Sequence, residues 1–435
     1  MLRTLTDDLI KWKDAEHRKP LFLQGIRHSG KTHLIKDFAA NYFEDILYLD
    51  FEADKNLVDF FGQNLDPNRI IKDLSIYREK DIKVGGTLIV FDEVQYCSEA
   101  LDSLKYFNEE APQYHIIAIS SSPAVSLQHG AAIPISNVDI LTLYPMSFYE
   151  FLLAQSPMLA MHLKESGFDR GAYKKFQSQL EEKFCDYQIV GGMPEVVQSW
   201  DANKSIEAVD KLLTQTIKSI ESDFISLAQT SQVAKLSAIF NSVPVQLTKK
   251  NRKFLFTTVK KSWRAKDLDD ALFWLMRAGL VYKVEHIEQP ALPLTANVNH
   301  THFKLYMCDV GLLRRIMHLP ASIILDKSDN NKETKSALIE NIVCSDLMQN
   351  FGERLYYWSA ENPGRAKVEF IVQYDDNIIP IEVKAGSASK ARSLSQYNMR
   401  FAPKKYILTG KDVDREDILP IYGFWNVKEW LNKKA

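Results

Sequence analysis

Short apolar runs alternate with amphipathic stretches along the first third of the chain. The runs predict strands at Leu21–Gln24, Ile46–Phe51, Thr87–Asp92, Tyr114–Ser120 and Val138–Leu143. The amphipathic stretches predict helices at Leu2–Asp14, His33–Tyr42, Arg69–Lys80 and Ala100–Glu110. Strands that alternate with helices of this length are typical of a parallel sheet covered on both faces. We therefore predict an α/β core over residues 1–155.

A long helical pattern follows over residues 158–243. The run Gly191-Gly192-Met193-Pro194 interrupts it, and the helical spacing then resumes. Ser147, where the chain leaves the last predicted strand, is the expected N-cap of the first of these helices. We predict a helical lid over residues 156–245 that packs beside the α/β core.

The next region has the outline helix, turn, helix, strand. A helix is predicted at Asp267–Ala278, where Gly279 ends it, and a strand at Leu280–Val284. This outline is typical of a winged helix, which we place at residues 246–320. Two more elements are predicted in it, a strand at Phe303–Met307 and a helix at Asp309–Met317.

Loop-like residues at 320–332 indicate a domain boundary. The pattern beyond it predicts a helix at Thr334–Asn350 and strands at Leu355–Trp358, Val368–Gln373 and Ile378–Lys384. We therefore predict a last α/β domain over residues 333–435. The chain contains no internal repeat and no low-complexity segment.

The stretch between the first strand and the helix at His33–Tyr42 carries a specific chemistry. Residues 25–32 read GIRHSGKT and fit G-x-x-x-x-G-K-[ST] without a mismatch. In such a loop, glycines let backbone N–H groups surround phosphate oxygens, and the next helix points its positive end at the anion. We expect Lys31 to reach the β- and γ-phosphates and the Thr32 hydroxyl to ligate Mg²⁺. The predicted nucleotide contacts are Gly25, Ile26, Arg27, His28, Ser29, Gly30, Lys31, Thr32 and His33.

The strand at Thr87–Asp92 ends in two carboxylates, within the sequence TLIVFDE. Because ligands collect at the strand ends of open α/β sheets, we expect Asp92 to hold the Mg²⁺ shell and Glu93 to orient or polarise the attacking water. The alternative is an ordinary buried strand that happens to end in acidic residues. The run Ser120-Ser121-Ser122 follows a later strand, and Ser121 there either contacts the γ-phosphate or the water, or belongs to a plain serine turn.

The composition is that of an ordinary globular protein, with 46% apolar and 25% charged residues. At about 150 residues per domain, 435 residues predict two to three domains. The four cysteines form no C-x-x-C pair, which disfavours a zinc site or a disulfide framework and fits a reducing cytosol. No signal segment opens the chain and no uncharged run approaches about 18 residues. These features predict a soluble, cytoplasmic protein without a membrane partner.

The most basic stretch is Lys249–Lys266, which holds eight cations and no acid. With a net charge of −2, any contact with nucleic acid has to come from such a local patch. Clustered cations neutralise several phosphates and give salt-dependent binding. The stretch is equally consistent with DNA contact and with a solvated surface. The cations are Lys249, Lys250, Arg252, Lys253, Lys260, Lys261, Arg264 and Lys266.

A second carboxylate cluster is predicted in the last domain. Glu369 lies on one strand, and Glu382 and Lys384 face the same side of the next. Two carboxylates and a lysine at strand ends are the arrangement of D…(D/E)-x-K nucleases, in which the acids hold Mg²⁺. Glu340 on the preceding helix is a further candidate ligand. A surface ion pair is the alternative, and the spacing alone favours it.

A series of segments in this order resembles, essentially end to end, the bacterial and archaeal AAA-type ATP-binding proteins with a C-terminal domain of unknown function. The segments are GIRHSGKTHLIKDFA, LIVFDEVQ, LKYFNEEAPQYHIIA, LYPMSFYEFL, GGMPEVV, KDLDDALFWLMRAGLVYKV, FKLYMCDVGLL, ALIENIV, LYYWSAENP and IIPIEVKAG. The resemblance implies a winged helix and a restriction-endonuclease-like fold in the C-terminal part. It also implies ATP binding and Mg²⁺-dependent hydrolysis through Lys31, Thr32, Asp92 and Glu93.

The chain departs from the family at three places. Ser121-Ser122, followed by Pro123, stands where the family usually has Gly-Ser, and Asn137 lies in a segment where relatives often carry Lys or Arg. An arginine finger contributes on the order of a thousandfold or more in rate, so its loss would slow hydrolysis, and Arg27 is the nearest spare cation. Glu369 replaces the usual Asp, which leaves metal binding possible and puts cleavage in doubt.

We therefore predict an ATPase with a P-loop core, a helical lid, a winged helix and a nuclease-like domain. Its ligands are ATP or ADP and Mg²⁺, and its nucleotide state is expected to change how the C-terminal domains dock, on DNA. One alternative is a nucleotide-gated binding module with little turnover. Another is a Mg²⁺-dependent DNA nuclease acting through the C-terminal domain. The oligomeric state stays open.

Overall fold

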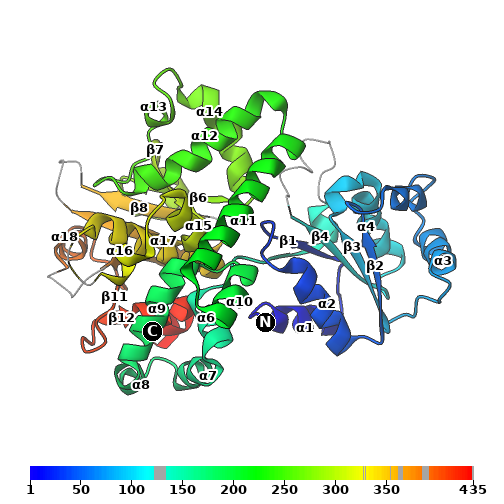
Figure 1. Cartoon of the computed structure of the whole chain (residues 1–435), viewed down its shortest axis with the longest axis horizontal. Helices are drawn as coiled ribbons and strands as arrows, with labels where there is room; N and C mark the ends of the chain where they lie inside the picture. Colours follow the sequence, from blue (N-terminus) through cyan, green and yellow to red (C-terminus); the bar gives the residue numbers. More distant parts are fainter. Residues whose placement is uncertain are drawn as a thin grey trace. The chain divides into compact units, whose positions relative to one another are not determined.

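The computed structural model describes residues 1–121, 134–326, 328, 330–352, 354–360, 366–384 and 391–433. The chain forms two compact units. The first consists of Met1–Tyr144 with Arg277–Gly279, and the second of Pro145–Met276 with Leu280–Ala435. Figure 1 labels their helices and strands. Among the described residues, no helix combines the length and the apolar character needed to cross a membrane.

The first unit is built on a five-stranded parallel sheet in the order β2-β3-β4-β1-β5. Its strands are β1 (Leu21–Gln24), β2 (Asp45–Asp50), β3 (Thr87–Asp92), β4 (His115–Ser120) and β5 (Asp139–Thr142). The predicted parallel α/β core is confirmed. Because all strands run the same way, their carboxyl ends share one edge, and the segments that follow β1, β3 and β4 meet there.

Helices cover both faces of this sheet (Figure 1). Leu9 of α1 (Thr6–Asp14) and Phe38 of α2 (Lys31–Tyr42) pack on one face. Leu74 of α3 (Pro67–Tyr77) and Leu104 of α4 (Ser98–Glu110) pack on the other. The helix α3 starts two residues earlier than predicted because the Asp66 side chain caps it by accepting from Asn68 N.

Helices fill the first half of the second unit, as the sequence predicts. They are α6 (Phe148–Gln155), α7 (Pro157–Ser166), α8 (Arg170–Lys175), α9 (Gln177–Val190), α10 (Pro194–Asn203), α11 (Ile206–Leu227) and α12 (Thr230–Leu247). Ser147 is the N-cap of α6, in a capping box with Glu150. The break between α9 and α10 falls at the predicted glycine pair.

A seven-stranded mixed sheet, in the order β12-β11-β10-β9-β8-β6-β7, organises the rest of this unit. Its strands are β6 (Val281–Ile287), β7 (Val298–Met307), β8 (Leu355–Ser359), β9 (Lys367–Tyr374), β10 (Asn377–Val383), β11 (Ile407–Gly410) and β12 (Ile418–Pro420). The helices in this part of the chain are α13 (Phe256–Val259), α14 (Ala265–Arg277), α15 (Val310–Ile316), α16 (Ala321–Leu325), α17 (Lys332–Phe351), α18 (Arg392–Phe401) and α19 (Val427–Lys433).

The sheet does not stop where the sequence predicts a boundary. β6 forms a hairpin with β7 and also pairs in parallel with β8, so the strands expected in the winged helix extend the C-terminal sheet. The segment expected to be loop-like at 320–332 contains the short helix α16, which forms because Ala321 and Ile324 are buried. The division of the chain into four domains stays a prediction.

The glycine pair between α9 and α10 allows two parts of the backbone to touch. Met146 N donates to Gly192 O at 2.7 Å, and a Cβ on Gly192 would lie 2.1 Å from Met146 O. Gly191 has a φ of +76°, and a Cβ there would lie 2.4 Å from Asp309 Oδ1. A side chain at either position would therefore push the entry of α6 or the Asp309 carboxylate away.

We expect Gly192→Ala to lower the free energy of unfolding by about 2–3 kcal/mol, the range for overpacked interiors. Gly62→Ala is the matched control, because its Cβ would meet nothing closer than 3.9 Å. Urea denaturation followed by tryptophan fluorescence measures both. Equal midpoints for the two variants would contradict the close approach.

Candidate functional site

The loop between β1 and α2 needs glycine at both ends. A Cβ on Gly25 would lie 2.3 Å from the backbone oxygen of Leu143, next to the end of β5. Gly30 has a φ of +91°, in the left-handed region that favours glycine. The chain thus turns from the end of β1 into the first turn of α2, and it aims the positive end of that helix at the loop.

Lys31 is buried inside this loop. Its Nζ donates to the carbonyl oxygens of Gly25 at 2.8 Å and Ile26 at 3.0 Å. A buried ammonium needs such acceptors, because an unpaired charge in the interior is costly. The two carbonyls therefore satisfy the ammonium in the interior of the loop.

The other loop residues divide between buried and surface positions. Ser29 is fully buried, and its Oγ has no hydrogen-bond partner among the described residues. Ile26 is also buried, whereas His33 at the surface lies 3.4 Å from the chain's amino terminus. His28 takes a left-handed φ of +65°.

Arg27 is not a spare cation, contrary to the expectation from the sequence. Its Nη2 lies 3.1 Å from Glu52 Oε2 in an ion pair just beyond β2. Glu52 follows β2, whose end lies at the same edge of the sheet as the loop, so the two side chains come within reach of each other.

Arg3 holds the loop from behind, and the sequence analysis missed it. Its Nη1 donates to Ser29 O at 2.8 Å and its Nη2 to Tyr144 O at 2.6 Å. The guanidinium therefore ties the middle of the loop to the segment after β5. Nothing in a lone arginine near the amino terminus indicates this role, since both acceptors are backbone atoms distant in sequence.

The Asp92 carboxylate lies at the tip of β3 beside the loop and is 3% exposed. Thr32 Oγ1 donates to its Oδ2 at 3.1 Å, the Tyr48 hydroxyl donates to the same oxygen, and Glu93 N donates to Oδ1 at 2.9 Å. Burial raises the pKa of Asp92, and the hydrogen bond from Tyr48 is the largest opposing effect. The expected proximity of Thr32 and Asp92 is present in the structure.

Glu93 takes a left-handed φ of +51°, which turns the chain sharply after β3. Ser121 Oγ donates to its Oε2 at 2.6 Å, and Gln95 Nε2 donates to the same oxygen. Ser121 follows β4, which lies between β1 and β3 in the sheet. Ser121, expected near the γ-phosphate, thus contacts Glu93, the carboxylate expected to orient water. Ser122 and Pro123 lie outside the described residues.

Asn137 lies at the opposite edge of the sheet. It precedes β5, whose far end, Thr142, pairs with Gln24 directly before the loop. Four residues of strand place about 13 Å between the two edges, and Asn137 Nδ2 donates instead to Glu109 Oε1 at 3.2 Å. A Lys or Arg here would lie at the edge of the sheet opposite the chain's own loop.

The second carboxylate cluster is an ion-pair network. Glu382 directly follows Ile381, which lies opposite Phe370 across β10 and β9. It accepts from Leu394 N at 2.9 Å and forms an ion pair with Lys384. Burial raises the pKa of Glu382. Glu369 accepts from Val383 N at 3.3 Å.

Glu340 belongs to an adjoining pair, because Tyr306, which donates to it, packs its ring on Phe370 next to Glu369. It forms a buried ion pair with Arg252 and accepts from the Tyr306 hydroxyl at 3.3 Å. Among the described residues, no three His, Cys, Asp or Glu side chains are placed to hold a metal ion. The contacts of Glu382 with Lys384 and of Glu340 with Arg252 are those of the ion-pair alternative, and the nuclease-like site stays a prediction.

Arg252 also corrects the expected basic patch, because it is 2% exposed and is neutralised by Glu340. The sequence counts it as a surface cation since its neighbours are charged. At the surface, Lys260 lies over the Trp263 ring, with Nζ 4.7 Å from the centroid. The other exposed cations of the stretch are Lys249, Lys250, Lys261, Arg264 and Lys266.

Lys304 on β7 is a buried cation that the sequence analysis missed. Its side chain is 2% exposed, and its Nζ has no hydrogen-bond partner in the part of the chain that the structure describes. It lies 4.6 Å from the centre of the Tyr357 ring. Burial, and then the like charge of Lys367, lower the pKa of Lys304 to about 7. The sequence feature that could have identified it is the position of this lysine inside the apolar run Phe303–Met307.

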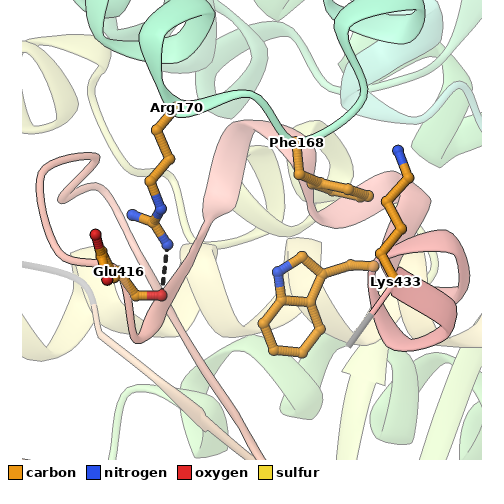
Figure 2. Close-up of a pocket in the computed structure, with 5 residues that line it drawn as sticks. Phe168, Arg170, Glu416 and Lys433 are labelled. Atoms are coloured by element: carbon orange, nitrogen blue, oxygen red, sulfur yellow. Dashed lines mark hydrogen bonds between the residues drawn. The ribbon is translucent and has the colours of Figure 1, made fainter. Parts of the chain in front are cut away.

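A surface pocket of about 360 Å³ lies between α8 and the chain's last helix (Figure 2). Its lining residues are Phe168, Arg170, Glu416, Trp430 and Lys433. Arg170 donates to the carbonyl oxygens of Glu416 at 2.7 Å and Ile418 at 2.9 Å. The guanidinium therefore holds the segment before β12 and is not offered to a ligand.

Three family models match the chain. Residues 17–152 match the AAA domain, residues 181–323 match a domain of unknown function, and residues 335–423 match a second domain of unknown function. The first match contains the whole loop, Asp92, Glu93 and Ser121. Residues 17–152 therefore match an AAA-type domain, and this part of the resemblance expected from the sequence is confirmed.

Several solved structures are similar to this chain. The Walker-type ATPase PABY2304 of Pyrococcus abyssi is 12% identical, with 73% of this chain and 96% of that chain covered and a TM-score of 0.41. The Orc1 protein of Aeropyrum pernix, solved in complex with DNA, is 13% identical, with 74% and 92% covered and a TM-score of 0.25. Protein VC1899 of Vibrio cholerae is 9% identical, with 95% and 97% covered and a TM-score of 0.19. These TM-scores are below 0.5, so the assignment depends on the AAA match and the geometry. No curated protein matches the chain.

We expect Lys304→Met to stabilise the protein, and more strongly at low pH. Between pH 7 and 10.5 the unfolded chain keeps the lysine proton and the folded chain does not, so the cost of burial grows as pH falls and is complete below pH 7. At about 1.4 kcal/mol per pKa unit, the gain is roughly 3–5 kcal/mol at pH 6 and close to zero above pH 10.5. Urea midpoints at pH 6 and pH 9.5 measure it, with the exposed Lys266→Met as control. A gain that is equal at both pH values would contradict the buried neutral amine.

Proposed function

We propose that this chain, whose residues 17–152 belong to the AAA domain family, binds ATP with Mg²⁺ and hydrolyses it. The observation that carries the proposal is the meeting of loop and acidic strand end. Thr32, in the first turn of α2, lies 3.1 Å from Asp92 at the tip of β3, within reach of the same ion. Lys31 is buried one residue before Thr32.

The residues at this place fit a magnesium ion. Mg²⁺ prefers oxygen ligands and is usually held by one or two carboxylates together with substrate phosphates, without an all-protein cage. Thr32 supplies a hydroxyl oxygen and Asp92 a carboxylate, which would hold the ion directly or through its waters. When bound, the ion neutralises charge on the phosphate oxygens as the γ-phosphoryl group transfers.

Lys31 and the loop amides would grip the triphosphate. The Lys31 ammonium now binds two neutral carbonyls, and a phosphate oxygen is a stronger acceptor because it is charged. Exchange of Gly25 O and Ile26 O for phosphate oxygens therefore needs a small movement of the side chain and no unfolding of the loop.

Glu93 would orient the attacking water. Its Oε2 already accepts hydrogen bonds from Ser121 and Gln95, whereas Oε1 accepts none from the described residues. The first oxygen fixes the carboxylate and the second is left for water. Ser121 thereby positions Glu93 and acts on the reaction through it.

Slow turnover is a second candidate, in which the chain acts as a nucleotide-gated binding module. It is favoured because Arg27 is paired with Glu52 and Asn137 lies at the far edge of the sheet. An isolated molecule then has no arginine finger from these two positions. The two candidates share ATP binding and differ in the hydrolysis rate.

Two variants test the site. Lys31→Ala removes the ammonium and is expected to weaken ATP binding at least tenfold, measured by calorimetry. Glu93→Gln keeps the shape and is expected to bind ATP normally but to lower phosphate release about a hundredfold, within the range for a positioned base. An ATPase rate in Lys31→Ala equal to that of the natural sequence would refute the proposal. A natural sequence that binds ATP without release would establish the binding module.

We further propose that the exposed part of the basic stretch contacts DNA. Lys260, Lys261 and Arg264 lie within five residues at the surface, beside Trp263. Cations interleaved with an aromatic ring suit phosphates and an adjacent base. The buried Arg252–Glu340 pair argues against opening the nearby carboxylates to a metal, so we propose no cleavage there.

Replacing Lys260, Lys261 and Arg264 together by Ala is expected to weaken duplex DNA binding about tenfold at 50 mM salt and to reduce the salt dependence. Fluorescence anisotropy at several salt concentrations measures both. Exposed lysines on α7 and α11, Lys164, Lys211 and Lys218, provide a charge-matched triple control. Equal losses in the two triple variants would leave only a general charge effect and contradict the patch. Cutting of the DNA in Mg²⁺ would contradict the absence of cleavage.

A further inference from the structure

Tyr48 on β2 reaches the acidic end of the neighbouring strand. In the parallel register Tyr48 lies opposite Val90, and Asp50 lies opposite Asp92. Residues two positions apart on a strand share a face, and a long side chain spans the diagonal between strands. The Tyr48 hydroxyl therefore lies beside the Asp92 carboxylate although no local motif joins the two residues.

The hydroxyl completes a set of three donors on that carboxylate. Tyr48 and Thr32 both donate to Oδ2, and the backbone N–H of Glu93 donates to Oδ1. A carboxylate offers about four acceptor positions, and these donors fill three of them. The remaining position belongs to Oδ1. The carboxylate is thus held in one orientation, with one acceptor position left for the ion's shell.

The ring of Tyr48 is itself fixed on both sides. It packs in the core between the sheet and α2, where Leu34 and Val90 are buried. The ammonium of Lys36 lies 4.2 Å from the ring centre. Lys36 is one helical turn after Thr32, so α2 presents Thr32 to the carboxylate and Lys36 to the ring. The phenol therefore connects β2, the tip of β3 and the first turn of α2.

We propose that Tyr48 is a positioning residue for the magnesium site, which orients Asp92 and Thr32 so that both face the ion together. The inference rests on the proposed binding of ATP with Mg²⁺. Groups that hydrogen-bond a metal ligand from behind set its orientation, and their loss typically weakens metal affinity about 10- to 100-fold. Among the hydrogen bonds of the described residues, the Tyr48 hydroxyl donates to Asp92, and none joins Tyr48 to a backbone amide of the loop Gly25–Thr32.

Tyr48→Phe removes the hydroxyl and keeps the ring. We expect its ATP affinity without Mg²⁺ to stay within about twofold of the natural sequence. The Mg²⁺ concentration that gives half of the full gain in ATP affinity is expected to rise about tenfold or more. Calorimetric ATP titrations at several Mg²⁺ concentrations measure both quantities. Tyr42→Phe, a hydroxyl deletion at the exposed end of α2, is the matched control and should change neither.

A double variant separates positioning from a general loss of structure. If Tyr48 acts through Asp92, adding Tyr48→Phe to Asp92→Asn should weaken Mg²⁺ dependence little further, because interacting positions are not additive. The positioning role would be overturned if the losses from Tyr48→Phe and Asp92→Asn were additive in the double variant. It would also be overturned if Tyr48→Phe weakened ATP binding without Mg²⁺ as much as it weakened binding with Mg²⁺. So would an unchanged Mg²⁺ requirement in Tyr48→Phe. If the natural sequence takes up no ATP at all, the proposed function itself fails, which is a different result.

Discussion

The Asp92 carboxylate is the group on which the geometry of the site depends. It is buried at the end of a central strand, where three donors from different elements satisfy its oxygens. Burial raises the pKa of Asp92, and the hydrogen bonds from Tyr48, Thr32 and Glu93 N oppose that rise. The same three hydrogen bonds align the first turn of α2 with the tips of β2 and β3. The hydrogen bonds that satisfy the carboxylate in the interior therefore also build the site.

The order of the strands explains which side chains meet there. Because β4 lies between β1 and β3, the segment after β4 comes between the phosphate-binding loop and the acidic strand end. This position brings Ser121 to Glu93. On the same reasoning, the two ends of β5 separate Asn137 from the loop by the length of the strand. The order and direction of the strands therefore determine which polar residues lie at the site, and residues close in sequence can lie at opposite edges of the sheet.

The sequence predicted those parts of the site that are local. The motif at Gly25–Thr32 is complete within eight consecutive residues, and the apolar run before Asp92 identifies a strand end. Tyr48 and Arg3 could not be predicted, because their partners lie 44 and at least 26 residues away and include backbone atoms. In the second unit, the pattern located β6 and β7 but not the pairing of β6 with β8, which joins residues about 70 apart. Arg252 was misjudged for the same reason, since its partner Glu340 comes from a distant helix.

The central claim is that the loop around Lys31 grips the phosphates of ATP with Mg²⁺ held between Thr32 and Asp92. A crystal structure with a non-hydrolysable ATP analogue and Mg²⁺ tests it most directly. The account predicts that Lys31 Nζ leaves the carbonyls of Gly25 and Ile26 for phosphate oxygens, with Thr32 and Asp92 facing the ion. Density for the analogue elsewhere, with Lys31 still bound to the two carbonyls, would contradict it.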